Sequence, residues 1–212
     1  MLLHRAPARV DPSRVDIALA DLPTLAVHAW ATRAVRGGVL GLEEWLRARV
    51  TAERLPRSLD VVAMAARSAE RVGSERVTLS FGAGHLPDLI GGGGLPPVHV
   101  PSIDLARQVG RPLGVLVTDA ERTALLAHRL LPRLRQVAGA AGPAVVPAPW
   151  AEQLRDHAER SVTALQRAGY PVRGRLELLV PPTAPPARSA SSEVSTLRLA
   201  MDLLLETKDG AW

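Results

Sequence analysis

The chain has 212 residues, 47% of them hydrophobic and 22% charged, which suits one ordinary domain with an appendage or two small domains. It contains no cysteine, so disulfides, thiol catalysis, iron–sulfur clusters and thiolate zinc sites are excluded. The formal net charge of +5 comes from arginines that are spread along the chain, with Lys208 as its only lysine. This distribution argues against a nucleic-acid surface, which needs clustered cations and stacking aromatic residues.

The sequence also lacks the signals of membrane insertion. No stretch approaches 18 uninterrupted apolar residues, and residues 1–10 carry arginine and proline where a signal peptide needs apolar residues. We therefore expect a cytoplasmic protein that has no contact with a membrane.

The amino-terminal part is expected to be helical. Asp11-Pro12 is typical of a helix start, and Pro23 would break or kink that helix. Apolar residues at helical spacing then predict a helix that ends at Gly37-Gly38. The same pattern predicts helices at 42–55 and at 58–73.

Strands are expected in the middle of the chain. Val77–Phe81 has the best strand pattern, and Leu113–Val117 is a candidate for a second short strand. Residues 82–102 between them are rich in glycine and proline and are predicted to form a loop.

Further helices follow. Thr118 and Glu121 have the spacing of a capping box in front of a helix that Pro132 ends or kinks. His128 lies three residues from Leu125 and from Leu131, and is expected at the edge of the core. A helix beginning at Pro149 is predicted to end at Gly169.

The carboxyl-terminal region predicts a tethered helix. We expect an amino-terminal arm at 1–13, a domain at 14–181, a linker rich in proline, alanine and serine at 182–192, and a helix within 193–212. One face of that helix is apolar and needs a docking surface, either on its own domain or on a partner, a second copy of the chain included. Its candidate partner-binding residues are Val194, Leu197, Met201, Leu204 and Leu205.

No catalytic or metal-binding motif stands out. The histidines show neither HxxxH nor HExxH spacing, and no Walker loop or GxSxG motif is present. We expect no metal, no retained cofactor and no catalytic residue. The best candidate for anion binding is the pair Arg33 and Arg36 beside Gly37 and Gly38, because two arginines one turn apart would lie beside free backbone amides.

Three stretches resemble the actinobacterial P-loop sulfotransferase-like family. The first holds Asp21-Leu22, Trp30, Arg33, Val35–Gly38 and Leu42–Leu46; the second is Ala65–Phe81, and the third is Ala158–Pro181. The resemblance covers about residues 14–181. It implies an α/β fold, predominantly helical with one or two short strands, like the carboxyl-terminal half of a P-loop sulfotransferase-like fold.

The sequence departs from that family where the family binds its sulfate donor, 3′-phosphoadenosine 5′-phosphosulfate. The amino-terminal strand, phosphate loop and helix have no counterpart here. The family's arginine and serine contacts to the 3′-phosphate correspond to Ala20 and His28. Losing two charge-assisted hydrogen bonds would weaken nucleotide binding by roughly a hundredfold or more.

Three functions stay open at this point. The first is a non-catalytic or truncated relative that serves as an accessory or interaction protein. The second is a sulfotransferase-like transferase acting on an anionic or sugar metabolite, with its phosphate loop supplied elsewhere and Arg33 and Arg36 facing an anion. The third is a nucleic-acid-associated protein, which requires the scattered arginines to gather on one face.

Overall fold

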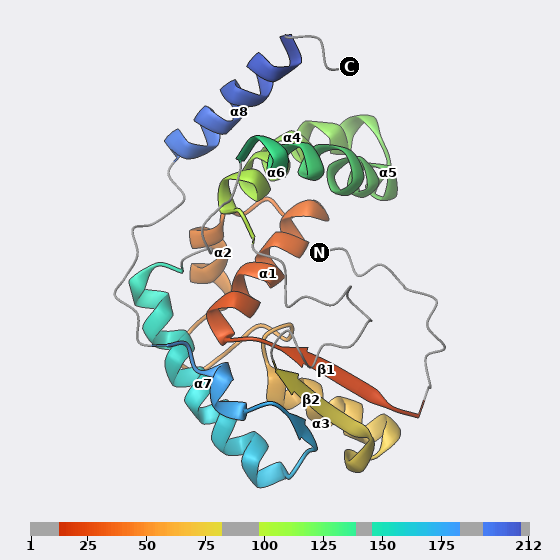
Figure 1. The fold of residues 1–212 in the computed structure, drawn as a ribbon, viewed down its shortest axis with the longest axis vertical. Coiled ribbons are helices and arrows are strands. Elements are labelled where there is room, and N and C mark those ends of the chain that lie inside the picture. Colours follow the sequence, from red (N-terminus) through yellow and green to blue (C-terminus); the bar gives the residue numbers. More distant parts are fainter. Residues whose placement is uncertain (1–12, 82–97, 139–145, 183–192, 209–212) are drawn as a thin grey trace.

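A computed structural model describes residues 13–81, 98–138, 146–182 and 193–208 (Figure 1). The described part is mostly helical and contains a short parallel sheet, which confirms the α/β, predominantly helical class. In chain order, the elements are β1 (Val15–Leu19), α1 (Leu22–Val35), α2 (Leu42–Arg49), α3 (Val61–Val72), η1 (Ser74–Arg76), β2 (Val77–Phe81), α4 (Val100–Leu116), α5 (Asp119–Leu125), η4 (Leu126–Leu130), α6 (Leu131–Ala138), α7 (Ala148–Ala168), β3 (Val172–Arg173), η5 (Leu176–Leu179) and α8 (Glu193–Lys208).

The sheet has the order β1-β2-β3, with both pairings parallel. β1 and β2 pair from Val15 with Val77 to Leu19 with Phe81. All five residues of the central strand β2 are buried, as expected for a parallel strand covered on both faces. β3 adds two residues, and the Leu79 amide also donates a hydrogen bond to the Pro171 carbonyl at 2.8 Å.

β1 corrects one sequence prediction. The segment after Asp11-Pro12 was expected to be helical, but Val15–Leu19 is a strand whose pairing with β2 buries Ile17 and Leu19. Asp11-Pro12 itself lies outside the described residues. Pro23 breaks no helix, because it occupies the first turn of α1, where its missing N–H costs nothing.

The helix α1 runs from the sheet to the group of helices α4, α5 and α6. Its amino-terminal end is capped by Asp21, whose carboxylate accepts from the Thr24 amide at 2.9 Å. The helix packs against α7 beside the sheet and against α4 above it. Figure 1 shows this arrangement, with α4, α5 and α6 beyond the far end of α1 from the sheet.

Several helix boundaries differ from the expected ones. The helix predicted at 42–55 ends at Arg49, and the one predicted at 58–73 begins at Val61, because Asp60 caps it instead of Ser58. Of the loop expected at 82–102, residues 82–97 lie outside the described part, whereas α4 already begins at Val100. Val77–Phe81 is confirmed as a strand, and α7 ends as predicted at Gly169, which has the left-handed φ of +69°.

The strand expected at Leu113–Val117 is wrong. Leu113–Leu116 forms the last turn of α4, even though Pro112 lies inside that helix. Gly110 and Gly114, one turn apart on α4, lie beneath side chains of the following helix: a Cβ at Gly110 would stand 2.8 Å from Leu126 Cδ1. The two glycines let these helices pack closely, which a β-branched strand pattern does not reveal.

The capping box predicted at Thr118 is confirmed. The Thr118 hydroxyl accepts from the Glu121 amide at 3.3 Å, and the Glu121 carboxylate accepts from the Thr118 amide at 2.9 Å. These hydrogen bonds from Thr118 lower the pKa of the exposed Glu121 carboxyl. Replacing Thr118 with alanine should lower the free energy of unfolding by about 1 kcal/mol, measured by urea denaturation. A Thr123→Ala control on the same helix should change it by less, and an equal loss in both variants would contradict the assigned cap.

Pro132 does not end its helix. The chain passes from α5 through the π-helical turn η4 into α6 without a break, and Pro132 lies in the first turn of α6. A π-helical turn inserts one extra residue per turn and is found often at functional sites. Nothing in the sequence pattern indicates this turn.

Candidate binding groove and the carboxyl-terminal helix

One of the described cavities is an apolar groove between α4 and the continuous helix formed by α5, η4 and α6. It has a volume of about 730 Å³, within the range of roughly 300–1,000 Å³ that is usual for binding sites. We call it the α4–α6 groove. Its lining residues are Val109, Leu113, Leu125, Leu126, His128, Arg129, Leu130, Pro132, Arg133 and Gln136.

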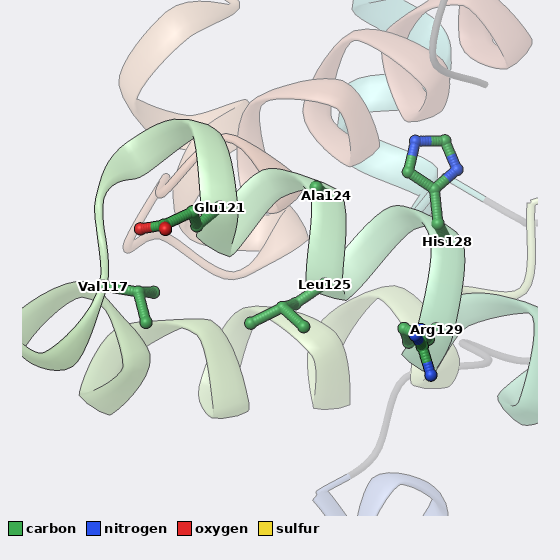
Figure 2. Close-up of a pocket in the computed structure, with 6 residues that line it drawn as sticks. All are labelled: Val117, Glu121, Ala124, Leu125, His128 and Arg129. Atoms are coloured by element: carbon green, nitrogen blue, oxygen red, sulfur yellow. The ribbon is translucent and has the colours of Figure 1, made fainter.

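A smaller cavity of about 390 Å³ adjoins this groove and shares Leu125, His128 and Arg129 with it. Figure 2 shows the Leu125 side chain between its own helix and α4, whereas the His128 ring points away from α4. His128 is exposed, so the expected place at the edge of the core is wrong. The two cavities are thus continuous along α5 and η4, and the smaller one also has the acidic Glu121 on its lining.

The charge of the α4–α6 groove is one-sided. Arg129 and Arg133 lie on its lining, and none of the ten lining residues is acidic. Leu125 and Val109 remain 41% and 36% exposed, so apolar surface is open to water there. An apolar floor with cationic edges suits an apolar ligand or helix that carries negative charge.

The predicted anion cradle at the end of α1 lacks the expected free amides. The Gly37 amide donates to the Ala34 carbonyl at 3.2 Å, and the Gly38 amide donates to the Arg33 carbonyl at 2.8 Å. Both bonds close the carboxyl end of α1, which carries negative partial charge and attracts cations. Arg33 and Arg36 are exposed.

A cation from another helix occupies that end. Arg122 is only 9% exposed, and its Nη2 donates to the Arg36 carbonyl at 3.2 Å and lies 2.9 Å from the Asp119 carboxylate. Gly37, with φ of +97°, leaves room for this guanidinium, since a Cβ there would clash with Nη2. The geometry thus explains Gly37 by the close approach of Arg122 and gives no support for a phosphate at this turn.

His28, which stands where the sulfotransferase-like family has a phosphate-binding serine, is half-buried on α1. Burial lowers the pKa of its imidazole to about 4, and Asp21 partly opposes the shift. The ring is therefore neutral at pH 7 and offers a phosphate no charge.

This pKa predicts a pH-dependent stability. Because the folded-state pKa lies below the ordinary value of 6.5, the unfolded chain takes up the proton first as the pH falls. The contribution of His28 is complete above about pH 6.5 and is lost towards pH 4, by on the order of 1–2 kcal/mol after allowing for its partial exposure. Urea denaturation at pH 7 and pH 4.5 should show a smaller loss for His28→Gln than for the wild type. Equal losses would contradict the assignment.

A serine and a histidine do meet at the start of α4. His99 Nδ1 lies 2.7 Å from Ser102 Oγ, and burial lowers the pKa of the His99 imidazole. Ser102 is only 1% exposed, however. The hydroxyl is therefore almost fully shielded from solvent by the described residues.

A third cavity, of about 230 Å³, lies between α7 and the segment before α3. Two of its polar side chains contact the backbone: His157 Nε2 lies 2.7 Å from the Thr51 carbonyl, and Arg160 donates to the Ala52 carbonyl at 2.9 Å. The Asp60 carboxylate accepts from the Ala63 amide at the start of α3. Among the described residues, no group of three histidine, aspartate or glutamate side chains is arranged to hold a metal ion.

The carboxyl-terminal helix α8 docks on the domain and still leaves apolar residues in water. It packs against α4 and α6, with Leu199 and Thr196 each 5% exposed. On the opposite side, Leu197, Met201 and Leu204 are 63%, 55% and 69% exposed. We call these three residues the α8 stripe. The side chains of Val194 and Leu205 and residues 183–192 of the expected linker lie outside the described part.

No described helix has the length and apolar character needed to cross a membrane. Comparisons with models of known protein families, with curated proteins and with solved structures found no match.

Proposed function

We propose that this chain is a non-catalytic accessory protein that works by binding a protein through its carboxyl-terminal helix. The observation that supports this proposal is the two-sided character of α8. Leu199 seats the helix on α4 and α6, and the α8 stripe presents three large apolar side chains to water. An exposed apolar patch on a helix with a docked opposite face is typical of an interaction surface.

The proposal keeps the resemblance to the helical half of a P-loop sulfotransferase-like protein. Two features support a role without the nucleotide: His28 is neutral at pH 7, and the Gly37 and Gly38 amides are engaged within the end of α1.

Calorimetric titration with adenosine 3′,5′-bisphosphate tests the non-catalytic part. We expect no binding at millimolar nucleotide. Micromolar binding that is lost in an Arg33→Ala, Arg36→Ala double variant would overturn the proposal, and the chain would then be a nucleotide-dependent transferase. Turnover of a sulfate donor by the purified chain would overturn it equally.

Site-specific photocrosslinking in the native cell tests the interaction part. A benzophenone amino acid at Met201 should give a discrete adduct with a protein, because this position is exposed on the α8 stripe. The same group at Leu178, an exposed leucine of η5 that is 47% exposed, is the matched control. Equal labelling patterns at the two positions, or no adduct at Met201, would contradict a binding role for α8.

A further inference from the structure

The cavity between α7 and the segment before α3 is lined by charged residues of both signs. We call it the α3–α7 cavity. Glu53 and Asp60 bring carboxylates to its lining, and Arg160 brings a guanidinium. Its volume of about 230 Å³ is below the range of roughly 300–1,000 Å³ that is usual for drug-sized ligands. A cavity of this size and composition suits a small charged metabolite.

The fold holds the guanidinium of Arg160 in place without using all of its donors. Its Nη2 donates to the Ala52 carbonyl at 2.9 Å and lies 3.0 Å from His157 Nδ1. Since arginine can only donate, His157 accepts at Nδ1 and carries its proton on Nε2, which donates to the Thr51 carbonyl. Within the described part of the chain, Nε and Nη1 of Arg160 have no hydrogen-bond partner. These N–H groups remain available for charge-assisted hydrogen bonds to an anion.

Asp60 places a carboxylate in the same cavity and is also held by the backbone. Its Oδ1 accepts from the Ala63 amide at 2.9 Å and so caps α3, whereas Oδ2 has no partner among the described residues. None of the ion pairs between described residues joins Asp60 or Glu53 to Arg160. Asp60 is half-buried and Glu53 is exposed. The cavity therefore contains an anion and a cation that are both held in place and do not pair with each other.

The other lining residues supply a hydroxyl and an apolar wall. Ser161 follows Arg160 on α7, and its hydroxyl makes no hydrogen bond with the described residues. Two residues further on, by contrast, the Thr163 hydroxyl donates back to the Glu159 carbonyl at 3.1 Å. The apolar wall consists of Leu55, Val62 and Ala164.

We propose that the α3–α7 cavity binds a free α-amino acid with a short aliphatic side chain. The carboxylate of this ligand accepts from Arg160 and Ser161, its ammonium group donates to Asp60, and its side chain contacts the apolar wall. A ligand with a single charge would remove water from Arg160 and Asp60 and pair only one of them, which costs free energy. This inference goes beyond the proposed function, because no residue of α8 lines the cavity.

Calorimetric titration of the full chain with L-valine tests the inference. We expect a dissociation constant below about 1 mM. Isovalerate is L-valine without its amine, and isobutylamine is L-valine without its carboxylate, so each compound lacks one of the two charges. Each should bind at least about tenfold more weakly than L-valine, since a charge-assisted hydrogen bond contributes about that factor or more.

Two substitutions assign the two charges to their residues. Asp60→Asn keeps the cap of α3, because asparagine caps a helix as well as aspartate does. It should raise the dissociation constant of L-valine at least about tenfold and remove its advantage over isovalerate. Arg160→Gln should remove the advantage of L-valine over isobutylamine. The matched control is Arg167→Gln, an exposed arginine of α7 outside the cavity, which should bind L-valine as the wild type does.

Thermal unfolding without ligand shows whether each variant is folded, and Asp60→Asn decides by itself if Arg160→Gln is not. Three results overturn the inference. The first is no binding of L-valine or L-alanine at about 10 mM. The second is binding of isovalerate or isobutylamine as tight as that of L-valine, which indicates a site for an anion or a cation alone. The third is normal L-valine binding by Asp60→Asn. None of them bears on the nucleotide titration or on crosslinking through α8, so the proposed function is judged separately.

Discussion

Replacing Trp30 with alanine should lower the free energy of unfolding by about 3–5 kcal/mol. Trp30 is 1% exposed in the middle of α1, and its indole Nε1 donates to the Leu40 carbonyl at 3.1 Å. The change leaves a large cavity in the helix that joins the sheet to α4, and it removes the partner of a carbonyl in the connection to α2.

Urea denaturation followed by circular dichroism measures this loss. Trp30→Phe is the informative comparison, because it keeps much of the ring volume and removes the hydrogen bond to Leu40, at an expected cost of about 1–2 kcal/mol. If Trp30→Ala lowered the free energy of unfolding no more than Trp30→Phe does, the packing of Trp30 would contribute less to stability than its burial indicates.

Replacing Gly110 with valine should cost about 2–3 kcal/mol. Gly110 is buried on α4, and even a Cβ at this position would stand 2.8 Å from Leu126 Cδ1. Leu126 is 1% exposed and belongs to η4, so the branched side chain must push the π-helical turn away from α4. Gly110→Ala should cost less, since alanine recovers up to about 1 kcal/mol of helix propensity.

The matched control for Gly110→Val is Ala120→Val, and both are measured by thermal and urea denaturation. Ala120 is an exposed helical residue of α5, so valine there should lower the free energy of unfolding only through its lower helix propensity, by a few tenths of a kcal/mol. Similar losses in the two variants would mean that α4 and η4 separate without cost, in conflict with close packing over the glycines.

The helices of this protein are largely visible in its sequence because their signals are local. Thr118 with Glu121 marks the start of α5, and Gly169 marks the end of α7. The predominantly helical α/β class and the strand Val77–Phe81 were predictable for the same reason. The apolar face of the last helix was also predictable, although the sequence could not show that Leu199 docks while Leu197 stays in water.

What the sequence could not show depends on contacts between distant segments. Val15–Leu19 becomes a strand because β2 lies beside it. The local pattern predicted a helix there, because Asp11-Pro12 is typical of a helix start. Leu113–Leu116 is helical because the small Gly110 and Gly114 let α4 pack closely beneath Leu126 and Arg122. β3 is too short for any periodicity to detect.

The groove belongs to the same class of missed features. Its walls come from α4 and from the helix containing η4, and no sequence motif predicts a π-helical turn. The packing of Gly37 against Arg122 was not predictable for a related reason, since Arg122 is far away from this glycine in the chain.

The parallel sheet also affects how fast this protein reaches its structure. β2 pairs with Val15–Leu19 on one side and with Val172–Arg173 on the other, so both partners of the central strand are separated from it by long stretches of chain. Closing such loops costs entropy before any contact compensates for it, and folding slows as contacts become less local. During synthesis the sheet stays incomplete until residue 173 has left the ribosome, by which time α1 to α7 have emerged. We therefore expect a mostly helical protein whose refolding is as slow as that of a mixed α/β domain, with the two-residue strand β3 added among the last steps.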